Sequence, residues 1–140
     1  MSADPESDVL AIIAAGTSYT ENTDLFRGPI IPAKVPGEAS PPIPQEAVFV
    51  RFATGTPPLV HPYDNVQEKT YTIDVLVRGR PLDYKGPRDD AQTILDLLNN
   101  NPPSGYYRAK TATSHPQWVD QEDSGAHVFA VSVEYWKLEA

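Results

Sequence analysis

The sequence predicts an α+β fold in which a mostly antiparallel sheet of about four to five strands carries two helices. Three observations lead to this class. Residues 66–79 and residues 127–136 each alternate apolar with polar side chains, as a strand with one buried face does. Residues 88–100 instead place apolar side chains at helical spacing. The expected order along the chain is helix, strand, strand, strand, helix, strand, strand.

The first expected helix covers residues 4–16. Asp4 should cap it, Pro5 should occupy its first position, and Gly16 should end it. A short strand is expected next, over residues 25–31, where a glycine and a proline indicate a sheet edge or a strand end.

Proline dominates the next part of the chain. Nine of the 15 prolines lie between Pro29 and Pro62, which predicts an extended excursion over residues 29–62 interrupted by one strand. That strand is expected at residues 47–54, and the connection 54–65 should project from the body because it is long for a hairpin. The excursion suits a connecting arm, or alternatively a proline-rich ligand for an aromatic groove.

Two long strands should supply the buried face of the sheet. Within them, along residues 71–77 and again along residues 129–135, every second side chain is apolar or aromatic. The side chains of that face are Tyr71, Ile73, Val75, Val77, Phe129, Val131, Val133 and Tyr135. A polar strand near residues 106–114 and a loop at residues 115–126 are expected between the second helix and the last strand.

The second helix should lie on this buried face. Pro87 is placed to start it, and Asp89 and Asp90 then fall in the first turn, where the helix dipole favours carboxylates. Its apolar stripe consists of Ala91, Ile94, Leu95 and Leu98. Three asparagines and two prolines at residues 99–103 should end it.

Size and charge limit the classes of protein to be considered. At 140 residues the chain has the length of one domain, so a single domain over residues 1–140 is expected. No apolar run approaches the ~18 residues of a membrane-spanning helix, and the start does not resemble a signal peptide. A net charge of −8 argues against nonspecific binding to nucleic acid or to an acidic membrane.

The sequence contains no pattern that indicates catalysis, a cofactor or a metal. It has no cysteine, no G-x-S-x-G elbow and no glycine-rich phosphate loop. The three histidines lack the spacing of metal ligands, and the acidic run at residues 120–123 lacks the ligand order of a calcium loop. We therefore expect no catalytic, cofactor-binding or metal-binding residues, and an enzyme is disfavoured.

The densest positive stretch is a turn-rich loop before the second helix. Its basic residues are Arg78, Arg80, Lys85 and Arg88. They suit either a solvated loop balanced by nearby carboxylates or a contact with the acidic Asp120, Glu122 and Asp123 of a neighbouring copy. Separated patches of opposite charge are typical of a heterologous interface that can close a ring.

The two tryptophans are further candidates for an interface. Trp118 falls in the expected loop at residues 115–126, and Trp136 lies on the strand face opposite the apolar one. At least one of them is expected to anchor a contact between subunits, because tryptophan is enriched at such anchors. The alternative is that a helix covers the face that carries Trp136.

The closing segment QEDSGAHVFAVSVEYW, residues 121–136, is the most specific feature of the chain. Its Glu122, Asp123 and Gly125 precede an aromatic-rich strand. Together with the order of elements, this segment resembles the tail terminator proteins of long-tailed bacteriophages, also called tail completion or minor capsid proteins. The excursion at residues 29–62 is longer and richer in proline than that family's pattern requires, and the basic loop has no counterpart in it.

The resemblance implies an α+β subunit that forms a ring of itself, expected to be a hexamer, at the head-proximal end of the tail tube. The ring would stop tube polymerisation and join the head, so its partners would be the tail tube protein and a head-closure or neck protein. DNA would pass through the channel without specific binding, and the protein would reside in the virion. The resemblance implies no cofactor and no membrane contact.

Three other readings remain open from the sequence. The first is another head–tail connector, such as a head-closure or stopper protein. The second is a monomeric binding module that uses the proline-rich segment as a ligand or arm. The third is a small enzyme whose site converges from loops.

Overall fold

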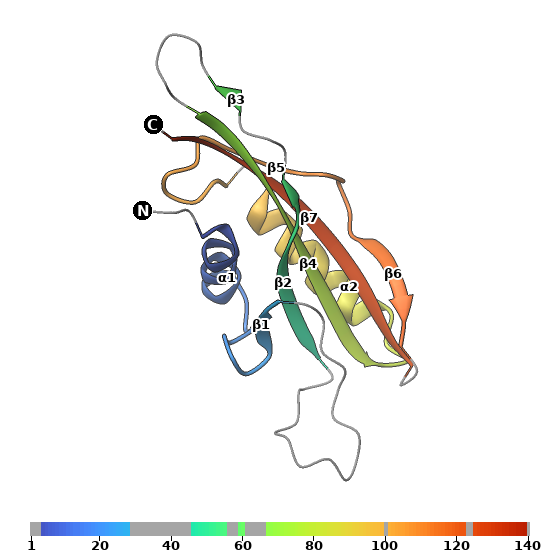
Figure 1. Ribbon diagram of the computed structural model, residues 1–140. Coiled ribbons are helices and arrows are strands. Elements are labelled where there is room, and N and C mark those ends of the chain that lie inside the picture. Colours follow the sequence, from blue (N-terminus) through green and yellow to red (C-terminus); the bar gives the residue numbers. More distant parts are fainter. Residues whose placement is uncertain are drawn as a thin grey trace.

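The computed structural model in Figure 1 describes residues 4–28, 46–55, 59–60, 67–99, 101–122 and 125–139. In this part of the chain two helices accompany a mixed, mostly antiparallel sheet, so the predicted α+β class is confirmed. The elements are α1 (Pro5–Gly16), β1 (Leu25–Arg27), β2 (Ala47–Gly55), β3 (Leu59–Val60), β4 (Gln67–Pro81), α2 (Lys85–Leu98), β5 (Arg108–Thr111), β6 (Gln117–Gln121) and β7 (Ala126–Glu139).

The sheet has seven strands within the described residues. The main path runs β1-β2-β4-β7-β5, while β3 pairs with β4 and β6 pairs with β7. The β1–β2 pair is parallel, and the other described pairs are antiparallel. Two short strands, β3 and β6, are additions to the predicted order, and they raise the strand number above the expected four to five.

Helix α1 begins where the sequence predicts. The backbone N–H of Ser7 donates to Asp4 Oδ1 at 3.3 Å, which is the expected cap, and Pro5 occupies the first turn. Val9 and Ile13 of α1 are fully buried. Strand β1 covers the start of the predicted strand at residues 25–31, and residues 29–31 lie outside the described part of the chain.

The two long strands form the centre of the sheet. Val75 of β4 lies opposite Val131 of β7 on one side and Val50 of β2 on the other. This register places the predicted apolar residues on one face, where all are buried except the partly buried Tyr71. The predicted buried face of these strands is confirmed.

Helix α2 begins earlier than predicted. It starts at Lys85, so the expectation that Pro87 starts the helix with Asp89 and Asp90 in its first turn is wrong. The physical reason is local, because Asp83 Oδ1 accepts a hydrogen bond from the backbone N–H of Gly86 at 3.1 Å and turns the chain into the helix sooner. The apolar stripe is buried as expected, at Ala91, Ile94, Leu95 and Leu98.

Strand β6 replaces part of the loop expected at residues 115–126. All five of its residues are exposed, so the strand has no alternation of apolar and polar side chains that would reveal it. Its pairing with β7 holds it in place, with a register irregularity between Trp118 and Asp120. Strand β5 is shorter than the strand expected at residues 106–114.

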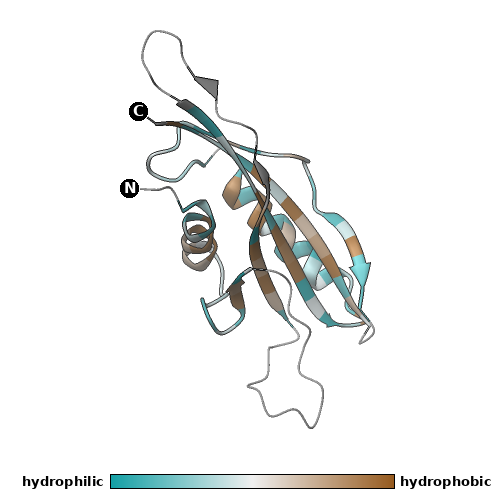
Figure 2. Cartoon of the chain, viewed as in Figure 1, coloured by the Kyte–Doolittle hydropathy of each residue, from teal (hydrophilic) through white to brown (hydrophobic). Residues whose placement is uncertain are grey.

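Both described helices pack on the same face of the sheet and share one apolar cluster with it. Figure 2 shows the corresponding apolar stripes along β4, β7 and α2. The opposite face carries a smaller cluster without helical members, formed by Ala47, Phe49, Leu76 and Val128. Neither described helix is long and apolar enough to cross a membrane.

Candidate subunit interface

Arg78 does not lie on an exposed loop. It is part of β4, its side chain is fully buried, and it lies between Ala47 of β2 and Val128 of β7 on the face without helices. Its guanidinium is 5.3 Å from the centre of the Phe49 ring, and Nη1 is 3.4 Å from Glu122 Oε1. Neither of the two expected roles, a charge on a solvated loop or a contact with a neighbouring copy, therefore fits Arg78.

Arg78 and Glu122, two of the charged residues predicted at an interface, pair with each other in the same chain. Burial lowers the pKa of the Arg78 guanidinium, and the nearby Glu122 carboxylate opposes that shift. The basic residue and the acidic residue do meet, but within one chain. This pair thus fixes the turn after β6 against β4.

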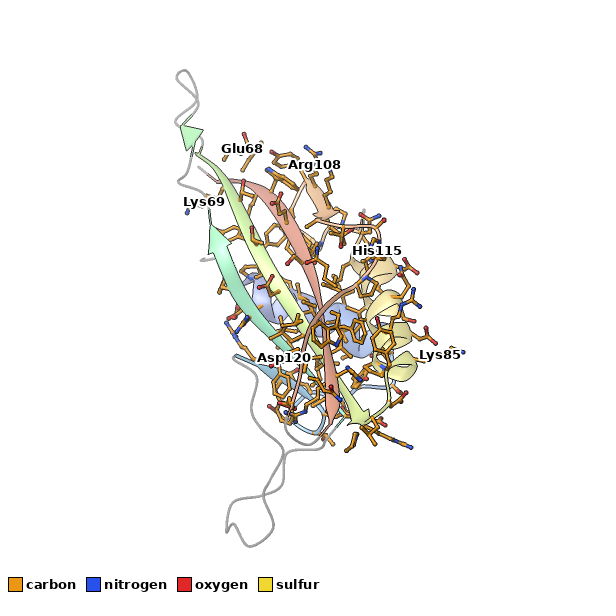
Figure 3. All side chains as sticks on the ribbon, turned by 90° about the vertical axis from the view of Figure 1, so that its right-hand side faces the viewer. Glu68, Lys69, Lys85, Arg108, His115 and Asp120 are labelled. Carbon is orange, nitrogen blue, oxygen red and sulfur yellow. The ribbon has the colours of Figure 1, made fainter. Side chains whose placement is uncertain are left out.

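The other basic residues of the predicted loop are exposed. Arg80 is 75% exposed and its Nε forms an ion pair with Glu46 Oε1 of the same chain. Arg88 Nη1 lies 3.9 Å from Asp89 Oδ1, and both side chains are about half exposed, so this pair contributes little. Figure 3 shows Lys85 projecting outward from the start of α2.

The predicted acidic segment does not act as one unit. Asp120 is exposed on β6, where its Oδ1 accepts a hydrogen bond from the backbone N–H of Gln121 at 2.8 Å. Glu122 is the partner of Arg78, and Asp123 lies outside the described residues. Of the two that lie within the described residues, Asp120 is exposed and Glu122 is partly buried.

Trp118 lies in β6 and is 50% exposed. Its indole Nε1–H donates to Nδ1 of His127 at 3.0 Å, so the imidazole accepts at that nitrogen. The His127 ring meets Tyr84 edge-on, with ring centres 5.2 Å apart, and Tyr84 in turn meets the buried Phe129 at 5.1 Å. A chain of aromatic rings therefore runs from the surface at Trp118 into the core.

Leu82 lies two residues before Tyr84 and is 80% exposed. Its backbone φ is +65°, a left-handed conformation that a leucine rarely adopts, and its N–H donates to the carbonyl of Gly125 at 2.9 Å. An added Cβ at Gly125 would lie 3.1 Å from Leu82 Cδ2, so the two residues are in close contact. We call Leu82, Tyr84, Trp118 and His127 the Leu82–Trp118 patch.

Trp136 lies near the other end of β7, on the face without helices. Its Cα partners are Thr70 of β4 and Arg108 of β5, and the Arg108 guanidinium lies 4.6 Å from the centre of its ring. The indole is partly buried under this cation. No described helix covers the face that carries Trp136, because both described helices lie on the other face.

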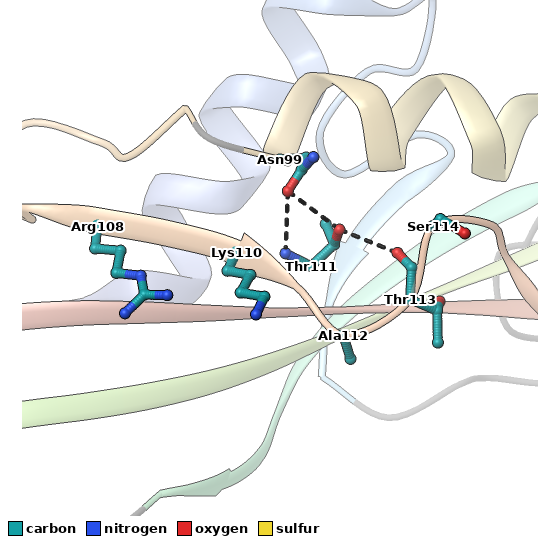
Figure 4. Close-up of a pocket in the computed structure, with 7 residues that line it drawn as sticks. All are labelled: Asn99, Arg108, Lys110, Thr111, Ala112, Thr113 and Ser114. Carbon is teal, nitrogen blue, oxygen red and sulfur yellow. Dashed lines mark hydrogen bonds between the residues drawn. The ribbon is translucent and has the colours of Figure 1, made fainter.

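A pocket near Trp136 is lined by the residues drawn in Figure 4: Asn99, Arg108, Lys110, Thr111, Ala112, Thr113 and Ser114. Asn99 Oδ1 accepts hydrogen bonds from the backbone N–H of Thr111 at 3.4 Å and from its hydroxyl at 3.3 Å. These bonds tie the end of α2 to β5, so a structural role accounts for the polar groups there.

Comparison with models of protein families and with curated proteins found no match for this chain. Within the described ranges, no group of three or more histidine, aspartate or glutamate side chains is placed to hold a metal ion.

Trp118 is a candidate from the sequence alone, whereas Leu82, Tyr84 and His127 are not. Leu82 and Tyr84 belong to the turn PLDY before α2, whereas Trp118 and His127 come about forty residues later. The available signal was the presence of two large apolar residues in an otherwise charged turn. Their convergence depends on the pairing of β4 with β7, which the turn itself does not reveal.

Proposed function

We propose that the chain is a structural assembly protein that closes into a ring of its own copies and caps the head-proximal end of a bacteriophage tail tube. The ring would stop tube polymerisation and offer a surface to a head-closure or neck protein. The Leu82–Trp118 patch is the observation that supports this proposal most strongly.

Exposed aromatic and aliphatic side chains of this kind are typical of interface anchors. Tyr84 and Trp118 are each 50% exposed, and both residue types are enriched among the side chains that dominate binding energy. Leu82 is more exposed still, and its left-handed backbone costs about 1–2 kcal/mol. A position that combines strain with an exposed leucine is best explained by a contact that the leucine makes outside the chain.

The position of the segment that resembles tail terminators is the second support. The segment QEDSGAHVFAVSVEYW, which carries the resemblance to tail terminators, covers the end of β6, the following turn and most of β7. The same turn is joined to β4 by the Arg78–Glu122 pair and contacts Leu82 through Gly125. The residues that carry the resemblance are thus those that position the Leu82–Trp118 patch.

The proposal is tested by deleting the coding sequence from the phage that carries it and measuring tail lengths by electron microscopy. Loss of a tail terminator gives abnormally long tails without heads. Loss of a head-closure or stopper protein leaves tails of normal length, so that result would remove the proposal. Restoration of normal tails by the chain supplied from a plasmid is the control.

A further inference from the structure

We infer that the Leu82–Trp118 patch binds a proline-rich segment, and that the occupant is residues 41–44 of a neighbouring copy of this chain. This inference rests on the proposed function, because it assigns a contact that joins two copies in the ring. It also gives a role to the proline-rich excursion, which the proposed function alone leaves without one.

Two exposed aromatic rings of the patch contact the same imidazole. The His127 ring meets the Tyr84 ring edge-on at 5.2 Å and the Trp118 ring at 6.3 Å between ring centres. Tyr84 and Trp118 are each half exposed, so both offer an aromatic surface to a partner. Surfaces lined by aromatic rings are the sites at which proline-rich segments dock.

The segment at residues 41–44 has the composition that such a surface selects. Its sequence, PPIP, has prolines at the first and fourth positions and carries no charge. In a polyproline helix these two prolines lie on the same side, about 9 Å apart, a spacing that suits two rings joined through one imidazole. Proline favours this conformation before binding, so little conformational entropy is lost when the segment docks.

The charges around the patch leave its apolar centre as the surface for a partner. Arg80 pairs with Glu46, and Arg88 lies near Asp89, so these charges are balanced within the chain. Asp120 is exposed on β6, so the edge does not carry a single sign of charge. An uncharged segment meets no like charge at such an edge, whereas a strongly charged partner would be repelled by part of it.

The residues that flank the excursion favour the patch of a neighbouring copy. Residues 29–45 lie outside the described part of the chain, and the description resumes at Glu46, just before β2. Strands β4 and β7 separate β2 from β6 (Figure 1), and three strand spacings amount to about 14 Å. Pro44 precedes Glu46 by two residues, which span at most about 7 Å, so this tether is too short to bring Pro44 to β6 of its own chain.

A neighbouring copy is free of this limit, because its patch can approach the segment from outside. Each copy carries both the segment and the patch, so the contact is heterologous and repeats from copy to copy. It closes a ring when the rotation between copies allows, and every patch in the ring is then covered.

A synthetic peptide of residues 38–46 provides the first test. The receptor is the chain with Pro41→Ala, Pro44→Ala and Trp136→Phe, which retains the patch, lacks a competing segment and leaves Trp118 as its only tryptophan. The peptide should shift the emission of Trp118 to shorter wavelength and should bind about tenfold more tightly than the same peptide with both proline substitutions. Equal binding of the two peptides, or no shift with either, would overturn the inference.

Mixing two variants tests whether the contact joins two copies. Pro41→Ala with Pro44→Ala alters the segment, and Trp118→Ala alters the patch. Each variant alone should sediment as a monomer and should melt at the temperature of the natural chain. Together they should form a one-to-one dimer, because one intact segment and one intact patch remain.

The matched control is Pro57→Ala with Pro58→Ala, which removes two prolines from another part of the excursion. This variant should assemble as the natural chain does. A mixture that stays monomeric, or assembly by the Pro41→Ala, Pro44→Ala variant alone, would overturn the assigned contact.

Different outcomes reject the contact and the proposed function. Rings that still form after Pro41→Ala and Pro44→Ala would reject the contact and leave the function standing. Tails of normal length in the deletion phage would reject the function, whichever peptide the patch binds.

Discussion

Arg78 and Glu122 form an ion pair that joins the interior of the sheet to the turn between β6 and β7. The guanidinium is fully buried, its Nη1 lies 3.4 Å from Glu122 Oε1, and the carboxylate is partly exposed. The backbone of Glu122 adds two hydrogen bonds within the same turn, to Gly125 and to Ala126. The pair therefore holds the turn against which Leu82 packs.

Loss of Glu122 should cost more stability than replacement of Arg78 by an apolar residue. Glu122→Ala leaves a buried cation without this carboxylate, and we expect the free energy of unfolding to fall by about 2–3 kcal/mol. Arg78→Met retains the volume over Phe49 and removes the buried charge, so the expected loss is about 1 kcal/mol or less. Urea denaturation of both variants measures the difference, and a larger loss for Arg78→Met would contradict this account of the pair.

Leu82→Asn should stabilise the folded chain. Asparagine tolerates a positive φ better than leucine does, and the exposed leucine loses little burial, so the free energy of unfolding should rise by about 1 kcal/mol. Leu82→Ala is the matched control, because it removes the side chain and retains the strain. Thermal unfolding should therefore shift upward for Leu82→Asn only. Equal shifts for both variants would show that backbone strain is not the cause.

The elements that bury an apolar face are the ones that the sequence predicts. Strands β4 and β7 were predictable because one face of each is apolar, and the stripe of α2 was predictable for the same reason. Strand β6 was not, because all its residues are exposed and its existence depends on pairing with β7. The burial of Arg78 was missed because arginine is rarely buried unless it is paired, and its partner lies 44 positions away.

The candidate site was predictable only in part, for a related reason. Residue type alone pointed to Trp118, because tryptophan is enriched among the anchors of interfaces. Tyr84 comes from another part of the chain, and its link to Trp118 through His127 is a consequence of strand pairing. Charge alone suggested Arg80, Lys85 and Arg88, but it could not separate these exposed side chains from the buried Arg78.

Alkaline pH should destabilise the protein through Tyr135. Its side chain is fully buried, its hydroxyl has no hydrogen-bond partner among the described residues, and burial raises its pKa above the ordinary value. An unfolded tyrosine loses its proton near pH 10, whereas the folded Tyr135 keeps it to higher pH. The folded state therefore binds more protons in that range, and stability falls as the pH rises above about 10.

Tyr135→Phe tests this account. The variant should be more stable by about 1 kcal/mol at neutral pH, because it removes a buried hydroxyl that has no hydrogen-bond partner in the described part of the chain. It should also lose less stability than the wild type between pH 10 and pH 12, measured by urea denaturation at each pH. An unchanged dependence on pH in that range would show that Tyr135 is not responsible.

The two tryptophans allow the contact surface to be located by fluorescence. Trp136→Phe leaves Trp118 as the reporter, and its emission should move to shorter wavelength as self-association removes the half-exposed indole from water. Trp118→Phe leaves Trp136, whose emission should remain constant. The same variant should weaken self-association by about tenfold or more, because it removes an anchor. A shift confined to Trp136 would move the interface to the opposite face of the sheet.

The central claim is that this chain caps the head-proximal end of a tail tube, and gold labelling of phage tails tests it most directly. Tails from cells that express the chain with an affinity tag would be labelled with gold particles and imaged by electron microscopy. We predict gold at one end of each tail, the end that joins the head. Gold along the tube, at the opposite end or on no tail at all would contradict the claim.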